Sequence, residues 1–162
     1  MEIATKLFAR NGYEATTTAA IALAYFEKYR PSFFHLGLGD TDEYGHRNDY
    51  ASYLDALRRA DSVIGQFADA LMGMGEIGAR TTVIITPDHG RNADFQHHGM
   101  LHPESGRTFV LAFGARVPHG ARCAATDVTL ADIAPTIRAL MGLPRDIGAG
   151  AGEPIRGIAG PP

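Results

Sequence analysis

TTVIITPDHGRN, residues 81–92, joins a run of β-branched residues to a turn that holds an aspartate, a histidine and a glycine. The TTVIIT part predicts a buried strand, because β-branched side chains fit the pleated surface of a sheet. A second acidic turn with a histidine, DTDEYGHRND, follows the apolar run SFFHLGLG at residues 32–39. Ligands of α/β sheets gather beyond the carboxyl ends of the strands. Both turns are therefore expected where such a protein binds a ligand.

The flanking sequence predicts strands that alternate with helices. The expected elements are a helix at 15–29, a strand at 32–39, a helix at 48–74, strands at 81–86 and 108–113, and a helix at 129–142. This order predicts an α/β fold with a largely parallel sheet flanked by helices. We expect residues 1–145 to form a single, partial α/β metal-binding domain and the Gly/Pro-rich residues 146–162 to form a flexible tail.

Residues with capping chemistry stand at the expected helix ends. Asn48 or Asp49 would cap the second helix, and Thr129 the third. Gly142 would end the third helix, since glycine is favoured just past a helix C-terminus.

Composition narrows the range of partners. The chain has 162 residues, 45% hydrophobic content and a formal net charge of −3. We expect no nucleic-acid or membrane partner, because there is no basic field and no apolar run approaches the roughly 20 residues needed to span a bilayer. Met1 is followed by Glu2 and not by the charged and then apolar residues of a signal peptide, so we expect no signal peptide in this sequence. The localisation stays open. Cys123 is the single cysteine, so a cysteine-based zinc site is excluded.

The distribution of histidines indicates a metal site. Five of the seven histidines lie between residues 46 and 102, in or after the DTDEYGHRND turn: His46, His89, His97, His98 and His102. Carboxylate oxygens together with neutral imidazoles are ligands that zinc and manganese accept. The glycines beside them allow the tight turns that bring neighbouring ligands together.

These motifs, taken together, resemble a known superfamily. The segment FFHLGLGDTDEYGHRNDYASYLDALRRADSVIGQF, then TTVIITPDHGRN and then HHG, is similar to the metal-binding half of the alkaline phosphatase superfamily. The resemblance covers roughly residues 15–145 and is greatest to the type I phosphodiesterase and nucleotide pyrophosphatase branch.

The resemblance implies a two-metal hydrolase. One ion would be held by Asp42, His46 and His98, and the other by Asp88 and His89 together with an earlier aspartate and a Ser or Thr nucleophile. The metal would be Zn²⁺, with Mn²⁺ as the alternative, since O and N ligands suit both. In this family the nucleophile lies upstream of everything quoted above, so we expect the nucleophile segment to be missing from this chain. Thr16, Thr17 and Thr18 lie within a helical pattern and are poor candidates for it.

Neighbouring residues compete for some of these roles. Asp40 lies directly at a strand end, but the four-residue spacing to His46 favours Asp42 as the ligand. Gly99 follows His98, which favours His98 over His97. Arg91 is a candidate substrate-binding residue, because a guanidinium matches phosphate oxygens, although a loop salt bridge is an equal alternative.

A second, shorter resemblance points elsewhere. LFARNGYEATTTAAIA, residues 7–22, resembles the start of a TetR-type repressor. A helix stop and a strand follow it where a recognition helix should be, and no basic stripe accompanies it, so we interpret this match as coincidence.

Two functions therefore compete. The first is a metal-dependent hydrolase of phosphate, or related sulfate or phosphonate, esters, or a C-terminal fragment of one without its nucleophile. The second is a catalytically inactive metal-binding domain that associates with a partner chain. An unpaired sheet edge would favour self-association.

Overall fold

The computed structural model describes residues 3, 5–6, 17–118, 120, 128–145, 148 and 150–159. Cys123, Thr16 and most of the repressor-like stretch at 7–22 lie outside these residues. The chain divides into two compact units. The first comprises Met1–Gly75 with Asp94–His97, and the second comprises Glu76–Ala93 with His98–Pro162.

Three helices make up the described part of the first unit: α2 (Thr18–Tyr29), α3 (Asp40–His46) and α4 (Tyr50–Gly73). The helices predicted at 15–29 and 48–74 are thus confirmed with shorter ends. Thr17 caps α2, because its hydroxyl accepts a hydrogen bond from the backbone N–H of Ala20 at 3.2 Å. Asp49 caps α4 in the same way, accepting from the backbone N–H of Ser52 at 3.0 Å. Hydrogen bonds from Ser52 hold the pKa of Asp49 below its ordinary value.

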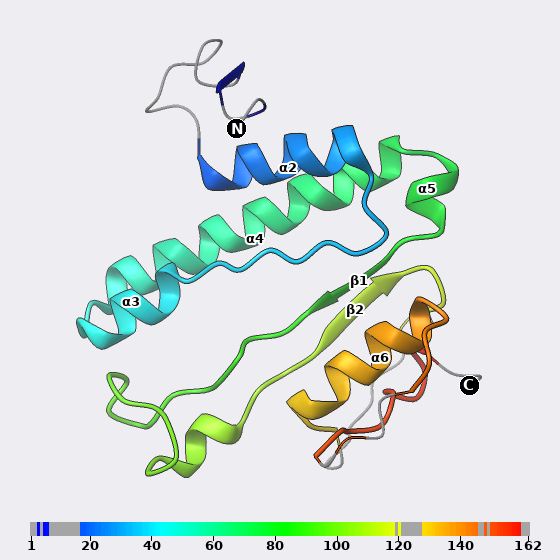
Figure 1. Cartoon of the computed structure of the whole chain (residues 1–162). Coiled ribbons are helices and arrows are strands. Elements are labelled where there is room, and N and C mark those ends of the chain that lie inside the picture. The colour runs from blue at the N-terminus through cyan, green and yellow to red at the C-terminus, as the bar shows by residue number, and fades with distance from the viewer. Residues whose placement is uncertain are drawn as a thin grey trace. The chain divides into compact units, whose positions relative to one another are not determined.

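An aromatic cluster packs α2 against α4, which lie alongside each other in Figure 1. Phe26 on α2, Phe34 in the following segment and Phe67 on α4 have ring centroids 5.4–5.7 Å apart. Phe26 is buried. Such tilted ring pairs are a favourable aromatic geometry, so this cluster is the core of the first unit.

The sequence between α2 and α4 differs from the prediction at two places. Residues 32–39 were expected to form a strand, but they carry no strand pairing in the structure, and Phe33 is 50% exposed. The following residues, expected to form a polar turn, make the short helix α3. An apolar run becomes a strand only when a neighbouring strand completes its hydrogen bonds, and the described residues give this run none.

The second unit contains α5 (Glu76–Ala79), β1 (Thr82–Ile85), β2 (Leu111–Gly114), α6 (Ile133–Leu140) and two short 3₁₀ helices, η1 (Pro103–Gly106) and η2 (Leu130–Asp132). The strands predicted at 81–86 and 108–113 are present but shorter. They pair antiparallel, with Thr82 opposite Gly114 and Ile85 opposite Leu111. The α/β class is therefore confirmed, whereas the largely parallel sheet is not: the sheet formed by the described residues has two antiparallel strands.

The C-terminal helix begins as predicted. Thr129 and Asp132 form a capping box, in which the backbone N–H of Thr129 donates to Oδ2 of Asp132 at 2.6 Å. The turn of η2 leads directly into α6, and Gly142, with φ +68°, follows its end. The prediction of a helix over 129–142 is confirmed as this pair of elements.

Part of the expected tail packs on α6. The backbone N–H of Glu153 donates to Oδ1 of Asp132 at 2.7 Å, and that of Ile155 donates to Oγ1 of Thr136 at 2.8 Å. Ile155 and Ile158 are buried. The hydrogen bond from the backbone of Thr129 is the main reason that the pKa of Asp132 lies below its ordinary value. These contacts give the second unit its core, while the mobility of residues 146–162 stays a prediction.

Within the described residues, none of the helices is both long enough and apolar enough to cross a bilayer.

Candidate metal centre

The first pair of predicted ligands lies on α3. Asp42 and His46 are one helical turn apart, so both side chains project from the same face of the helix. Oδ2 of Asp42 lies 3.4 Å from Nε2 of His46, and both side chains are partly exposed. A carboxylate and an imidazole at this separation can converge on one divalent ion. Asp40 pairs instead with Arg59 at 3.7 Å.

The second pair follows β1 in the second unit. Asp88 and His89 are neighbours, with Oδ2 of Asp88 3.7 Å from Nε2 of His89. Nδ1 of His89 lies 2.9 Å from the carbonyl oxygen of Gly90. A proton on Nδ1 would be donated to this carbonyl, which leaves the lone pair of Nε2 available to a metal. The backbone thus selects the tautomer that a ligand needs.

Gly90 is required by a close approach of two backbone segments. A Cβ at this position would lie 2.5 Å from the carbonyl oxygen of Arg107 and 2.8 Å from that of Glu104. The N–H of Gly90 donates to the carbonyl of Ser105 at 2.7 Å. The glycine of the Asp-His-Gly motif therefore allows the turn after β1 to dock on η1.

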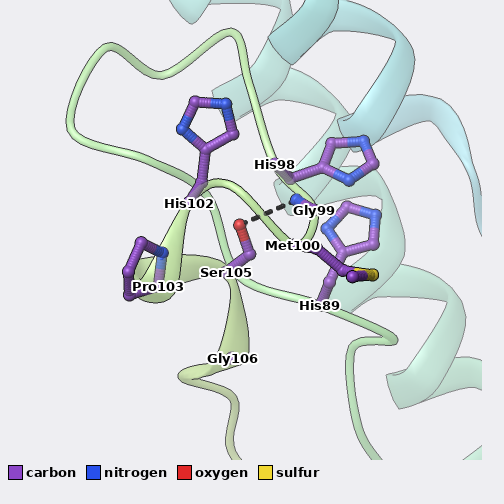
Figure 2. A pocket seen from close by; sticks show the side chains of 8 residues that line it. All are labelled: His89, His98, Gly99, Met100, His102, Pro103, Ser105 and Gly106. Atoms are coloured by element: carbon purple, nitrogen blue, oxygen red, sulfur yellow. Dashed lines mark hydrogen bonds between the residues drawn. The ribbon is translucent and has the colours of Figure 1, made fainter.

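His98 joins His89 although the two are distant in sequence. Their rings stack with centroids 3.8 Å apart and planes 12° from parallel. Both line a hollow of about 440 Å³ in the second unit, shown in Figure 2. The residues that line it are His89, His98, Gly99, Met100, His102, Pro103, Ser105 and Gly106.

Ser105 is a residue of this site that the sequence alone does not indicate. It is 7% exposed, and its hydroxyl accepts a hydrogen bond from the N–H of Gly99 at 3.0 Å, the dashed line in Figure 2. Its carbonyl accepts from Gly90, so one serine ties the turn after His89 to the turn after His98. A serine in a polar loop has no local signal for this role. His102, which is not one of the predicted ligands, lines the hollow as well.

His97 and Arg91 are not among the residues that line this hollow. His97 lies in the first unit, where Nδ1 is 2.7 Å from Oδ2 of Asp94, so its imidazole already has a carboxylate partner. Arg91 is partly buried in the second unit. Its contact with a substrate stays a prediction.

The donor set fits a divalent metal. His89 and His98 each offer a ring nitrogen, and these two atoms lie within 4.8 Å of each other. Zinc binds imidazole nitrogen at about 2.0–2.1 Å, so a small closure would bring both nitrogens onto one ion, and the observed spacing also suits two neighbouring ions. Both imidazoles are half-buried, and imidazole nitrogen is a ligand that zinc accepts.

Comparison with known proteins places this chain in a family. The model of the Metalloenzyme superfamily, which is alkaline phosphatase-like, matches residues 3–145. The chain belongs to this superfamily, as its motifs predicted, and the family and the histidine pair together indicate a divalent metal.

Curated relatives support the match. GPI ethanolamine phosphate transferase 1 of Homo sapiens is 28% identical over 130 residues, which cover 69% of this chain and 14% of that protein. The 2,3-bisphosphoglycerate-independent phosphoglycerate mutase of Cyanothece sp. is 32% identical over 132 residues, 76% of this chain and 24% of the mutase. The Synechococcus elongatus mutase is 30% identical over 148 residues, 83% of this chain and 25% of the mutase. No solved structure matches.

The chain thus spans between 14% and 25% of the length of these relatives. They are named for the transfer of phosphate-containing groups, so the superfamily of this chain includes phosphoryl-transfer enzymes.

Proposed function

We propose that this chain supplies the metal-binding part of an enzyme that hydrolyses phosphate esters or related sulfate or phosphonate esters. The observation that carries this proposal is the stacked pair of His89 and His98, two histidines of separate motifs that line one hollow. The family match over residues 3–145 supports it, because it covers all of the predicted ligands.

The resemblance divides the ligands between two ions. Asp42, His46 and His98 would hold one, and Asp88 and His89 the other. Zn²⁺ is the proposed metal, with Mn²⁺ as the alternative. Such ions, when bound, would stabilise the charge that develops on the oxygens of the transferring phosphoryl group. The phosphodiesterase branch of the superfamily belongs to the same proposal.

The residues of this chain have distinct parts in that site. The carbonyl of Gly90 holds the ring of His89 with Nε2 toward a ligand, and Ser105 fixes the turns that carry both histidines. Arg91 is proposed to contact the anionic oxygens of the substrate. The resemblance assigns no residue of this chain as the Ser or Thr nucleophile or as the further aspartate. A small-molecule phosphate ester is the proposed partner, rather than a nucleic acid or a membrane.

A second candidate function is an inactive metal-binding domain that associates with another chain. The observation that favours it is the two-stranded sheet, in which Leu111 is 57% exposed and Phe113 36% exposed. A short sheet with exposed apolar side chains is a template for pairing with a further strand. Self-association through this edge would change the molecular mass in solution.

One experiment separates the two functions. Metal content per chain is measured by elemental analysis of protein purified without chelator, together with hydrolysis of p-nitrophenyl phosphate and bis-p-nitrophenyl phosphate. Bound zinc or manganese in a monomer without turnover supports a metal-binding part that lacks its nucleophile, and turnover that is lost in Asp88→Asn supports a hydrolase that is complete within this chain. Bound metal without turnover, with a dimeric mass by light scattering, supports the second function. A chain that takes up neither metal overturns both.

A further inference from the structure

Phe95 has a backbone conformation that is unusual for its side chain. Its φ is +68°, in the left-handed region that glycine and asparagine occupy most readily. A bulky aromatic residue keeps such a conformation only when its surroundings hold it there, and such residues cluster at functional sites. The contacts of its ring and of the neighbouring residues hold Phe95 in this conformation.

Two tyrosines of α4 hold the ring. Tyr50 and Tyr53 stack on each other with planes 14° apart and centroids 6.0 Å apart. The ring of Phe95 meets both edge-on, at 5.3 Å from Tyr50 and 5.0 Å from Tyr53. Edge-to-face contacts of this kind stabilise beyond the area that they bury.

The neighbouring Asp94 stiffens the same segment. Its Oδ1 accepts hydrogen bonds from the backbone N–H groups of Gln96 and His97, both at 3.1 Å. Its Oδ2 lies 2.7 Å from Nδ1 of His97. An aspartate that closes a turn on its own following residues restricts the backbone of the segment on both sides of Phe95.

The packing of Phe95 matters because of where its segment lies along the chain. Asp94–His97 belongs to the first unit, whereas the residues on both sides of it belong to the second. His98 is the first residue after the segment, and it comes three positions after Phe95. Three residues span at most about 11 Å, so an anchored Phe95 restricts the reach of His98.

We propose that Phe95 is a positioning residue for the metal centre, and that its contact with Tyr50 and Tyr53 fixes the backbone that leads into His98, one of the proposed ligands. This inference rests on the proposed function, in which His98 shares an ion with Asp42 and His46. The ring of Phe95 acts through the backbone that it anchors, and the metal affinity of the chain depends on it.

The test is Zn²⁺ binding to the full chain, measured by isothermal titration. Phe95→Ala should weaken binding about tenfold, in the range found for residues that orient metal ligands. Phe95→Gly should weaken it as well, because glycine relieves the strain at φ +68° but lacks the ring. Phe95→Tyr keeps the ring and should bind Zn²⁺ as the unaltered chain does. Because alanine and tyrosine are both strained at φ +68°, a difference between these two variants reports on the ring. Tyr53→Ala should weaken binding, and should add little when combined with Phe95→Ala.

Controls separate this inference from the proposed function. Tyr29→Ala removes another exposed ring, paired with Tyr25 on α2, and should leave Zn²⁺ binding unchanged. His98→Ala measures the loss expected for a direct ligand. If His98→Ala weakens binding while Phe95→Ala and Tyr53→Ala do not, the inference is wrong and the proposed function stands. If the unaltered chain binds no Zn²⁺, both are wrong. Should Phe95→Ala fail to fold, Phe95→Leu and Tyr53→Ala provide the same comparison.

Discussion

The imidazole rings of His89 and His98 lie face to face, 3.8 Å between centroids, although nine positions separate them along the chain. The first follows a strand in an Asp-His-Gly turn, and the second lies in a polar loop. The stack places two imidazoles in the lining of one hollow, where the nitrogens of both can serve as metal ligands.

The first prediction concerns the choice between adjacent histidines. His98→Ala should lower Zn²⁺ affinity at least about tenfold, because it removes one of the two nitrogens of the stacked pair. His97→Ala is the matched control, since His97 is the preceding residue but bonds Asp94 instead. It should lower affinity by less than His98→Ala does. Equal losses in the two variants, measured by isothermal titration, would contradict the assignment of His98 as the ligand.

The second prediction concerns Ser105. Ser105→Ala removes the acceptor for the N–H of Gly99 and should cost about 0.5–1.5 kcal/mol of unfolding free energy. Because the same residue ties the two histidine turns together, Zn²⁺ affinity should fall as well. Ser62→Ala is the control, because its hydroxyl accepts an exposed hydrogen bond from Gln66 on the same helix, α4. Urea denaturation with and without Zn²⁺ measures both effects, and a Ser105→Ala variant indistinguishable from Ser62→Ala would refute the role.

The third prediction tests the close approach at Gly90. Gly90→Ala should destabilise the chain by more than about 1 kcal/mol, because the new methyl group meets two backbone carbonyls that cannot move independently. Gly65→Ala is the opposite case. Gly65 lies within α4 with open space around it, so alanine there should stabilise by about 0.5–1 kcal/mol. Thermal melts of the two variants should therefore shift in opposite directions, and a shift of both in the same direction would argue against the docking of the Gly90 turn on η1.

Local signals explain which features could be predicted from sequence. The helix α4 matches its expected range closely, because the apolar spacing and the Asp49 cap lie within the helix and its first turn. The capping box at Thr129 is local in the same sense. Strand formation at residues 32–39 depends on a partner strand elsewhere, and periodicity within the run cannot supply that information.

The same distinction between local signals and contacts made by folding applies to the candidate metal centre. Metal-ligating residue types and their spacing indicated Asp42 with His46 on α3 and Asp88 with His89 in the loop after β1, and the members of each pair lie close together. The hydrogen bond from Gly99 to Ser105 and the packing of Phe95 on α4 join residues whose chemistry is ordinary and whose proximity comes from folding. Neither has a sequence signature that a single chain could reveal.

The last prediction concerns acid stability and Asp132, which is 8% exposed and accepts hydrogen bonds from Thr129 and Glu153. These bonds favour the carboxylate, so its folded pKa lies below the ordinary value of 3.8. A lowered folded pKa means that the stabilisation is present above about pH 3.8 and is lost as the pH falls through the folded value. Asp132→Asn keeps the shape but weakens these bonds, and should cost about 1–3 kcal/mol at about pH 7. The deficit should shrink as the pH falls through the lowered folded pKa, where the wild-type carboxyl itself becomes protonated. Asp61→Asn on the exposed face of α4 should show no such deficit, and urea denaturation across this pH range measures both. A deficit for Asp132→Asn that stays constant as the pH falls would mean that the charge of this carboxylate is not what holds residues 153–155 to α6.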